Sequence, residues 1–318
     1  MTKNLFITAV GGDIACSILR CICDSYHYDK IIGCDITKYV QGAMYIDDLL
    51  IAPKYVDTDE YIKFIKMICI NNNITHFIPT TEAEIRIANN IRGFFDDNNI
   101  KLMINNKMII EIATSKYKTF KYLNDNNVLT PDTYYIKDYE DQLGYPLIIK
   151  PDFGCGSKNI YMVNSKLEYD HVKAIGSDSL VVQQYIGSSD EEYTVAVFSD
   201  GKDTKSIAFN RKLGFGGMSV FVETIEDKLI TSIAEKIAEV FDLRGSINIQ
   251  MRKENGRFYV FEINPRLSST VGFRHRLGFK DLIWWLDMLD GKQTEIDFEV
   301  KPGVKGIKTL DEMIFIED

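Results

Sequence analysis

Short apolar runs alternate with helical patterns over the first hundred residues, and this alternation is the feature that most restricts the fold. The apolar runs predict strands at 5–10, 30–34, 76–79 and 101–104, and helical spacing predicts helices at 14–23, 60–71 and 82–90. Strands that alternate with helices form a parallel sheet with helices packed on its faces. We therefore predict a doubly wound, Rossmann-like α/β domain over residues 1–104.

The pattern changes after residue 104, where strands begin to follow one another with few helices between them. The expected strands lie at 147–150, 159–163, 180–186, 193–198, 205–210, 246–252 and 257–263, and the expected helices at 166–174, 226–241 and 280–289. Runs of strands with separate helices are typical of α+β domains. At about 150 residues per domain, a chain of 318 residues fits two domains, so residues 105–318 are predicted to form the second.

Composition and charge exclude several classes of protein. The chain has 37 Lys and Arg against 46 Asp and Glu, a net charge of −9, which argues against nucleic-acid binding through a basic surface. No apolar run approaches the ~20 residues that span a bilayer, and no secretory signal pattern precedes the first strand. The six cysteines lack the paired spacing of a zinc site. We expect a cytoplasmic protein with reduced, mostly buried thiols and no membrane partner.

The first strand is followed by a glycine turn, Gly11-Gly12, and the second strand ends at Asp35. Dinucleotide-binding folds place a ribose-binding acid about 20 residues after such a turn. However, Cys16 and Ser17 stand where the third glycine of the fingerprint belongs. The turn is therefore interpreted as a structural turn of the doubly wound sheet, with nicotinamide binding or another small ligand as alternatives.

A lysine ends one strand of the second domain and a glycine-containing loop follows it. Lys150 closes the apolar run 147–150, and the loop 151–158 contains Gly154, Gly156 and Ser157. Glycine allows the backbone to approach an anion closely with its N–H groups. The loop is either a flexible flap suited to covering polyphosphate or an exposed hairpin that happens to begin with a lysine.

Two later strands carry polar residues at alternating positions. Residues two apart on a strand share a face, so Glu262 and Asn264 point the same way, as do Asn248 and Gln250. Carboxylate and amide oxygens are ligands that magnesium accepts, with phosphate oxygens and water completing the coordination. An ordinary amphipathic hairpin is the alternative, but it does not explain the Pro265-Arg266 pair just beyond the acidic strand.

A shared metal also restricts the turn between these strands. A two-residue turn at Asn255-Gly256 would pair Ile249 with Glu262 and direct Gln250 to the opposite face. A three-residue loop, 254–256, would instead pair Asn248 with Glu262. We therefore predict the three-residue loop.

The segment Glu262-Ile263-Asn264-Pro265-Arg266, together with the Gln250 strand and the Lys150 loop, resembles the ATP-grasp ligases. The chain is most similar to the synthetase domains of the carbamoyl phosphate synthetase large subunit and to the pyrrolysine-pathway ligase. Residues 47–53 and 78–84 resemble the N-terminal domain of that family. The resemblance implies a pre-ATP-grasp domain, an ATP-grasp domain with a mobile lid at about 115–186, and ATP with Mg²⁺ or Mn²⁺ as cofactors.

The resemblance also implies a set of site residues. Nucleotide contacts are carried over to Lys116, Lys150, Gly154, Gly156, Ser157, Gln183, Gln184, Tyr185, Ile186 and Glu192. Metal ligands are carried over to Gln250, Glu262 and Asn264, and catalytic roles to Arg266, Arg211 and Lys212. The resemblance implies that Arg211 and Lys212 lie on a mobile loop over the site of the acyl phosphate. Many relatives have a glutamate near Gln183 and Gln184 and a second carboxylate at Gln250.

The implied activity is a carboxylate–amine ligation through an acyl phosphate, with release of ADP and phosphate. Small-molecule substrates are expected, the segments 268–270 and 274–276 are candidates for contacting them, and a homodimer is compatible with the sequence. The alternatives are an ATP-grasp kinase, a nucleotide-binding module without ligase activity and, from the Gly11-Gly12 turn, a nicotinamide-dependent oxidoreductase.

Overall fold

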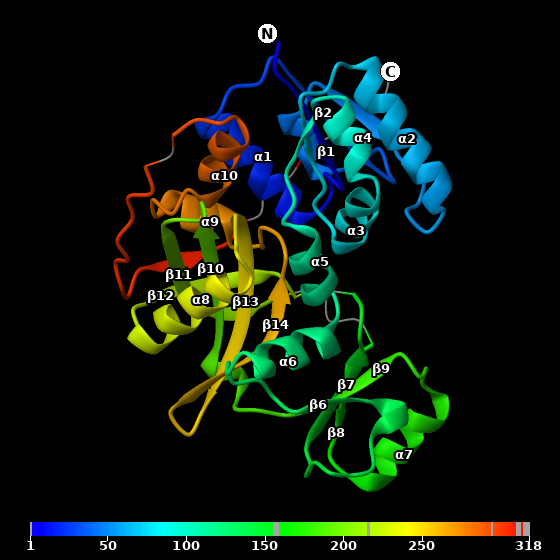
Figure 1. Ribbon diagram of the computed structural model, residues 1–318, viewed down its shortest axis with the longest axis vertical. Helices are drawn as coiled ribbons and strands as arrows, with labels where there is room; N and C mark the ends of the chain where they lie inside the picture. Colours follow the sequence, from blue (N-terminus) through cyan, green and yellow to red (C-terminus); the bar gives the residue numbers. More distant parts are fainter. Residues whose placement is uncertain (1, 155–158, 215–216, 294, 310–312, 314–318) are drawn as a thin grey trace.

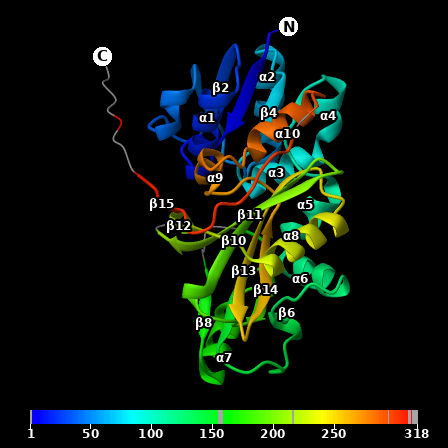
Figure 2. The same ribbon diagram turned by 90° about the vertical axis from the view of Figure 1, so that its left-hand side faces the viewer.

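The computed structural model describes residues 2–154, 159–214, 217–293, 295–309 and 313, and in these residues it contains three sheets. Figures 1 and 2 show a five-stranded sheet at one end of the long axis, a four-stranded sheet at the other end and a six-stranded sheet between them. The five-stranded sheet is parallel and the other two are antiparallel. The predicted fold class is therefore confirmed.

The parallel sheet has the strand order β3-β2-β1-β4-β5. Its strands are β1 (Asn4–Thr8), β2 (Lys30–Asp35), β3 (Asp48–Ile51), β4 (His76–Ile78) and β5 (Lys101–Leu102), and its helices are α1 (Asp13–Ser25), α2 (Thr58–Asn71), α3 (Glu82–Asn90) and α4 (Arg92–Asp97). The 3-10 helix η1 (Gln41–Tyr45) and the edge strand β3 were not predicted. The chain leaves β1 and β4 toward opposite edges of the sheet, so the crevice between their carboxyl ends is a topological switch point, where open α/β sheets bind ligands.

Two helices lead from the parallel sheet to the four-stranded sheet. They are α5 (Lys107–Ala113) and α6 (Lys116–Asp125), and α6 is capped by Ser115. The sheet has the order β6-β9-β7-β8, from β6 (Thr133–Tyr135), β7 (Leu147–Pro151), β8 (Tyr161–Val163) and β9 (Leu180–Gln184). With η2 (Ile136–Asp138) and α7 (Lys166–Ile175) it encloses a small core of its own, centred on Leu147, Ile149 and Val182. This region corresponds to the predicted lid.

The six-stranded sheet has the order β14-β13-β10-β11-β12-β15. Its strands are β10 (Glu192–Ser199), β11 (Thr204–Leu213), β12 (Ser219–Ile225), β13 (Gly245–Glu254), β14 (Arg257–Asn264) and β15 (Lys305–Ile307), and η3 (Ser189–Glu191) precedes β10. Helix α8 (Lys228–Val240) shares a core with Ile247 and Ile249 of β13. Helices α9 (Val271–Arg276) and α10 (Asp281–Leu289) lie beside α1, where Leu282 and Trp285 join the core of Leu19 and Ile22.

The hairpin between β13 and β14 differs from the prediction. Glu254 pairs with Arg257, so the turn has two residues, and both Asn255 (φ 49°) and Gly256 (φ 78°) adopt the left-handed conformation. An Asn-Gly turn of this kind matches the right-handed twist of the strands, which is why it forms in place of the predicted three-residue loop.

A β-bulge restores the shared face that the shorter turn would have removed, although Asn248 pairs with Asn264 and not with Glu262 as predicted. Met251 pairs with Val260, but the next pair joins Gln250 to Glu262, so Phe261 is an extra residue on β14. A bulge of this type reverses the in–out alternation beyond it. Gln250 and Glu262 therefore face the same side of the sheet, although the turn that connects their strands is not the predicted one.

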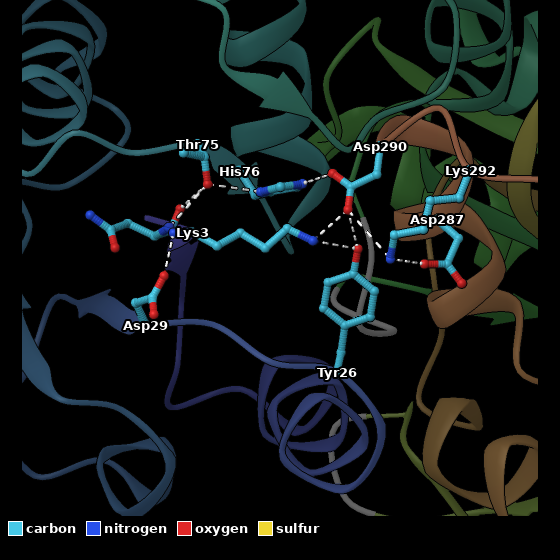
Figure 3. A network of polar contacts seen from close by, with 9 residues as sticks. Lys3, Tyr26, Asp29, Thr75, His76, Asp287, Asp290 and Lys292 are labelled. Atoms are coloured by element: carbon cyan, nitrogen blue, oxygen red, sulfur yellow. Dashed lines mark hydrogen bonds and ion pairs between the residues drawn. The ribbon is translucent and has the colours of Figure 1, made fainter. Parts of the chain in front are cut away.

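A polar cluster ties the amino end of the parallel sheet to the end of α10 (Figure 3). Asp290, the C-cap of α10, accepts hydrogen bonds from Lys3 Nζ and from the Tyr26 hydroxyl (2.5 Å), and His76 Nε2 lies 3.0 Å from its other oxygen. Burial alone would raise the pKa of Asp290, but the bonds from Lys3 and Tyr26 and the charge of His76 lower it to about 2. The carboxylate thus stays charged although it lies at a helix C-terminus, which disfavours negative charge.

We expect Asp290→Asn to lower the free energy of unfolding by about 1–2 kcal/mol at neutral pH. Because the folded-state pKa of Asp290 is depressed, its contribution is present above the unfolded-state pKa and is lost as the pH falls toward 2. Burial also lowers the pKa of His76. The contribution of His76 to the free energy of unfolding therefore also decreases on acidification. Urea denaturation at several pH values measures both effects.

The matched control is Asp287→Asn, which removes a partly exposed carboxylate paired with the exposed Lys292 at the same helix end. Surface pairs contribute little, so a change below about 0.5 kcal/mol is expected. An Asp290→Asn variant as stable as the unmodified protein at neutral pH would contradict the assignment.

Candidate functional site

A cavity of about 1040 Å³ is lined by strands of the two antiparallel sheets, by α1, α3 and α6, and by the segments that follow β1 and β4 of the parallel sheet. Most of the residues named from the sequence line it: Lys116, Lys150, Gly154, Gln183, Gln184, Tyr185, Ile186, Glu192, Arg211, Gln250, Glu262, Asn264 and Arg266. Lys212 is exposed and is not among the lining residues. Gly156 and Ser157 lie outside the described residues. The structure thus brings the predicted residues together, while the role of each one stays a prediction.

The bulge in β14 determines what this strand presents to the cavity. Tyr259, Phe261, Glu262 and Asn264 all line it, whereas a regular strand would direct Phe261 and Glu262 to opposite faces. The Phe261 ring centroid lies 5.7 Å from Lys150 Nζ. β14 therefore places the Phe261 ring beside Lys150, and the next residue, Glu262, is a possible oxygen ligand. Phe261 was not predicted, because its orientation depends on the bulge.

Lys150 is a buried cation with a neutral hydrogen-bond partner. Its ammonium group donates to Gln183 Oε1 (2.8 Å), and Gln183 Nε2 donates to the Thr133 hydroxyl (2.8 Å). No described carboxylate forms an ion pair with Lys150, and burial lowers its pKa to about 8. A buried charge without a counterion is costly, so Lys150 fits an anionic ligand. Gln183 therefore orients this lysine through its amide oxygen, while its amide nitrogen donates to Thr133.

Lys116 approaches the cavity from the first turn of α6. Its ammonium group donates to the carbonyl oxygen of Gly154 (2.9 Å), at the root of the loop that follows β7. Asp152, which was not predicted, is fully buried and accepts hydrogen bonds from the Ser115 hydroxyl and the Tyr117 N–H. Negative charge at a helix N-terminus is favourable. Asp152 therefore fixes the start of α6, and with it Lys116, against the end of β7.

Glu192 and Arg211 are bound to each other in the structure. Glu192 accepts hydrogen bonds from Arg211 (2.8 Å) and from Arg252 (2.9 Å), and its side chain is 9% exposed. Burial alone would raise the pKa of Glu192, but the two guanidinium groups lower it. Arg211 also donates to Gln250 Oε1 (2.8 Å). Arg211 is therefore a buried residue of β11 that connects this strand to β10 and β13. The prediction that it lies on a mobile loop is wrong.

The three proposed metal ligands are not equivalent. Glu262 Oε1 accepts a hydrogen bond from Asn264 Nδ2 (3.2 Å), which leaves Glu262 Oε2 and the Asn264 amide oxygen for a cation. Gln250 uses its amide oxygen for Arg211. Within the described ranges, no group of three or more His, Cys, Asp or Glu residues could hold a metal ion. Glu262 and Asn264 fit a magnesium ion that takes its other ligands from phosphate and water, and Gln250 fits it less well.

The part of the cavity where substrate contacts were expected contains Arg266, Ser268 and Ser269. Arg266 donates to the Leu267 carbonyl oxygen (3.0 Å), and its buried Nε has no hydrogen-bond partner in the described part of the chain. Arg274 is fully buried, donates twice to Asp281 and also donates to Ser268 and Thr270. The expected substrate contact at Arg274 is therefore wrong, and this residue holds the loop after Arg266 in place.

The Gly11-Gly12 turn is partly covered: other residues pack against Gly11, whereas Gly12 lines the cavity. Asp35 accepts the N–H of Gly11 (2.8 Å) and that of Ile36 (2.7 Å), so its carboxylate is already occupied. A Cβ atom at Gly11 would lie 2.9 Å from Val40 Cγ1, and the Gly42 N–H donates to Val10 O (3.1 Å). Helix η1 thus packs against the turn where a dinucleotide would place its phosphates. This arrangement supports the structural interpretation of the turn.

Two further expectations concern membranes and cysteines. Among the described residues, no helix is both long and apolar enough to cross a membrane. The described cysteines are free thiols: Cys16, Cys21, Cys34 and Cys69 are buried and Cys23 is exposed. Burial raises the pKa of each buried thiol.

Residues 113–270 match the family model described as ATP-grasp domain. The carbamoyl phosphate synthase large chain of Caldanaerobacter subterraneus is 28% identical over 195 residues, which are 55% of this chain and 18% of that relative. This chain therefore spans less than a fifth of the length of that relative. The tyramine–L-glutamate ligase of Methanocaldococcus jannaschii is 22% identical over 280 residues, which cover 86% of this chain and 80% of the ligase.

A solved structure has the same fold. It is the biotin carboxylase domain dimer of the Hydrogenobacter thermophilus 2-oxoglutarate carboxylase, in complex with MgADP, ADP and bicarbonate. The TM-score is 0.72 at 16% sequence identity, covering 92% of this chain and 71% of that one. The resemblance to ATP-grasp proteins that the sequence indicated is confirmed.

We expect the affinity for MgADP to fall as the pH rises through about 8, by up to about tenfold per pH unit. The reason is that free Lys150 loses its proton near this pH, while bound phosphate requires the charged form. Calorimetric titration between about pH 7 and about pH 9.5 measures the effect, and Lys150→Gln should bind more weakly with a flat profile. The control is Lys118→Gln, an exposed lysine of α6. A flat profile for the unmodified protein would contradict the prediction.

Glu262→Gln keeps the shape of the side chain and removes its charge. We expect it to raise the Mg²⁺ concentration required for half-maximal ADP binding by at least about tenfold. Fluorescence titration of ADP binding against Mg²⁺ measures this, with the exposed Glu239→Gln of α8 as the control. An unchanged Mg²⁺ requirement would remove Glu262 from the metal site.

Proposed function

We propose that this chain, which contains an ATP-grasp domain, is an ATP-dependent ligase that joins a carboxylate to an amine and releases ADP and phosphate. The observation that carries the proposal is the single cavity in which Lys150, buried and not ion-paired with any described carboxylate, lies with Lys116, Glu262 and Arg266. The similarity over most of the chain to a tyramine–L-glutamate ligase supports the ligase class. The similarity to these relatives does not determine which carboxylate and which amine this chain uses.

Each part of the cavity fits one part of the reaction. Phe261 and the backbone of Tyr185 and Ile186 form a surface for the base, and Lys150 and Lys116 offset the charge of the phosphates. A magnesium ion at Glu262 and Asn264 would neutralise developing negative charge. Arg266 lies on the acceptor side of these ligands, where it can stabilise the γ-phosphoryl group during transfer.

The proposed chemistry has two steps. A carboxylate oxygen of the substrate attacks the γ-phosphorus, the bond to the bridging oxygen breaks, and ADP leaves. The amine nitrogen then attacks the acyl carbon, a C–N bond forms, phosphate leaves with the C–O bonding electrons, and the nitrogen loses a proton to solvent. Enclosure of the cavity protects the acyl phosphate from water.

We expect ADP and phosphate as products, and hydroxylamine should intercept the acyl phosphate as a hydroxamate. The cations gather beside Glu262 and Arg266, so charge stabilisation is directed at γ-phosphoryl transfer rather than at attack on the α-phosphorus. Incubation with ATP, Mg²⁺, hydroxylamine and a pool of small carboxylic acids is read by hydroxamate formation and nucleotide chromatography.

The controls for this experiment are Lys150→Ala and Glu262→Ala, both of which should abolish hydroxamate formation. AMP as the main product would refute the mechanism. ADP without hydroxamate for any acid would favour a kinase, and absence of nucleotide turnover would favour a binding module.

A further inference from the structure

A buried carboxylate on the parallel-sheet side of the cavity has no hydrogen-bond donor. Glu82 is the first residue of α3, is 8% exposed and lines the cavity. The nearest cation is Arg266, whose Nη2 lies 3.8 Å from Glu82 Oε1 and thus beyond hydrogen-bond distance. The described residues donate no hydrogen bond to this carboxylate. Buried charged groups normally acquire such partners.

Glu84, two residues further along α3, is a buried carboxylate whose hydrogen bonds are formed within the protein. It is similarly buried, at 6% exposed. Its oxygens accept hydrogen bonds from the Tyr61 hydroxyl (2.6 Å), the Thr81 N–H (3.0 Å) and the Thr81 hydroxyl (2.7 Å). Unlike Glu82, it does not line the cavity. The difference indicates that the missing donors of Glu82 come from a ligand.

The position of Glu82 relates it to the reacting groups. It lies at the switch-point crevice, where the Thr80 hydroxyl donates to Thr8 O (2.9 Å) and holds the ends of β1 and β4 together. On its other side is Arg266, the residue proposed to meet the transferring phosphate, and the buried Nε of Arg266 also lacks a partner. A group held by Glu82 is therefore adjacent to the acyl phosphate.

The charge of Glu82 restricts the group that it can hold. A second carboxylate would be repelled, and a bare metal ion is disfavoured by the guanidinium group 3.8 Å away. A group with several N–H donors would form short, charge-assisted hydrogen bonds with the carboxylate. A protonated primary amine has these properties, and Arg266 remains free to bind phosphate. The ammonium group gives up one proton, which the Glu82 carboxylate can accept, before its nitrogen attacks the acyl carbon.

We infer that Glu82 binds the nitrogen of the amine substrate, and that this substrate is a primary amine, either free or as the amino group of an amino acid. The inference rests on the proposed ligase function for the identity of the site. The inference goes beyond the proposed function because it assigns the amine subsite to a residue of the parallel-sheet domain. Burial raises the pKa of Glu82, whereas the charge of Arg266 lowers it, and a bound ammonium group would act in the same direction as Arg266.

The first test is binding. The full chain is incubated with MgADP and, one at a time, with ammonium, ethanolamine, tyramine and the common amino acids, and the midpoint of thermal unfolding is measured. We expect at least one primary amine to stabilise the unmodified protein. Glu82→Gln should weaken that amine by about tenfold to a hundredfold, as hydrogen bonds to a charged group require. Glu84→Gln removes the same charge from the same helical turn, and should lower the unfolding midpoint without affecting amine binding.

The second test compares two nucleophiles. Hydroxylamine is largely uncharged at neutral pH, so its reaction should depend on Glu82 much less than that of a protonated primary amine. We expect Glu82→Gln to lower the ratio of amide to hydroxamate by at least about tenfold, and Glu84→Gln to leave this ratio unchanged.

The outcomes distinguish failure of the amine site at Glu82 from failure of the proposed ligase function. If no amine stabilises the unmodified protein, or if Glu82→Gln binds amines as well as the unmodified protein does, the inference is wrong. The inference is also wrong if Glu82→Gln lowers amide formation and hydroxamate formation equally, because Glu82 would then act by positioning Arg266. If the unmodified protein forms no hydroxamate but its amine binding still requires Glu82, the ligase function fails and the amine site stands.

Discussion

The arrangement of the site depends on one extra residue in β14. The two-residue Asn-Gly turn establishes a register in which Gln250 and Glu262 would face opposite sides, and the bulge at Phe261 reverses the alternation before Glu262 is reached. As a result, Phe261 and Glu262, adjacent in sequence, both face the cavity. Because side chains alternate strictly along a regular strand, an unbulged β14 could not direct the Phe261 ring and the adjacent Glu262 carboxylate to the same side of the sheet.

Two kinds of buried charge surround the cavity, and their hydrogen bonds distinguish them. Glu192 with Arg211 and Arg252, and Arg274 with Asp281, are paired within the protein and connect strands or loops. Lys150 has a neutral partner, and Glu82 has a single distant cation. Paired ions satisfy each other, whereas incompletely paired ones remain costly until a ligand arrives. The incompletely paired groups therefore support the proposed ligand sites, phosphate at Lys150 and an amine at Glu82.

Much of the fold and the membership of the site could be predicted from the sequence. The periodicity of 82–90 and 226–241 predicted α3 and α8, and the residues around Lys150 and Glu262 were placed in one site. The environment of individual side chains could not be predicted. Arg211 resembled a loop cation and Arg274 a substrate contact, but both are buried in ion pairs with residues far away in the chain or beyond a turn. Glu82 was seen only as part of a family segment, because its missing partners become visible only in three dimensions.

By itself, the sequence determined the order of the longer strands and helices, the change from alternating strands and helices to runs of strands, and the chemical types of the residues that meet at the cavity. These properties follow from local periodicity and from residue identity, which need no knowledge of distant contacts. The tertiary structure decided the register of β13 and β14, the pairing of Glu192 with two arginines, and the lack of a hydrogen-bond donor to Glu82 among the described residues. These properties depend on packing between strands and helices that are far apart in the chain, because a hydrogen-bond partner or its absence is fixed only when the sheets have come together.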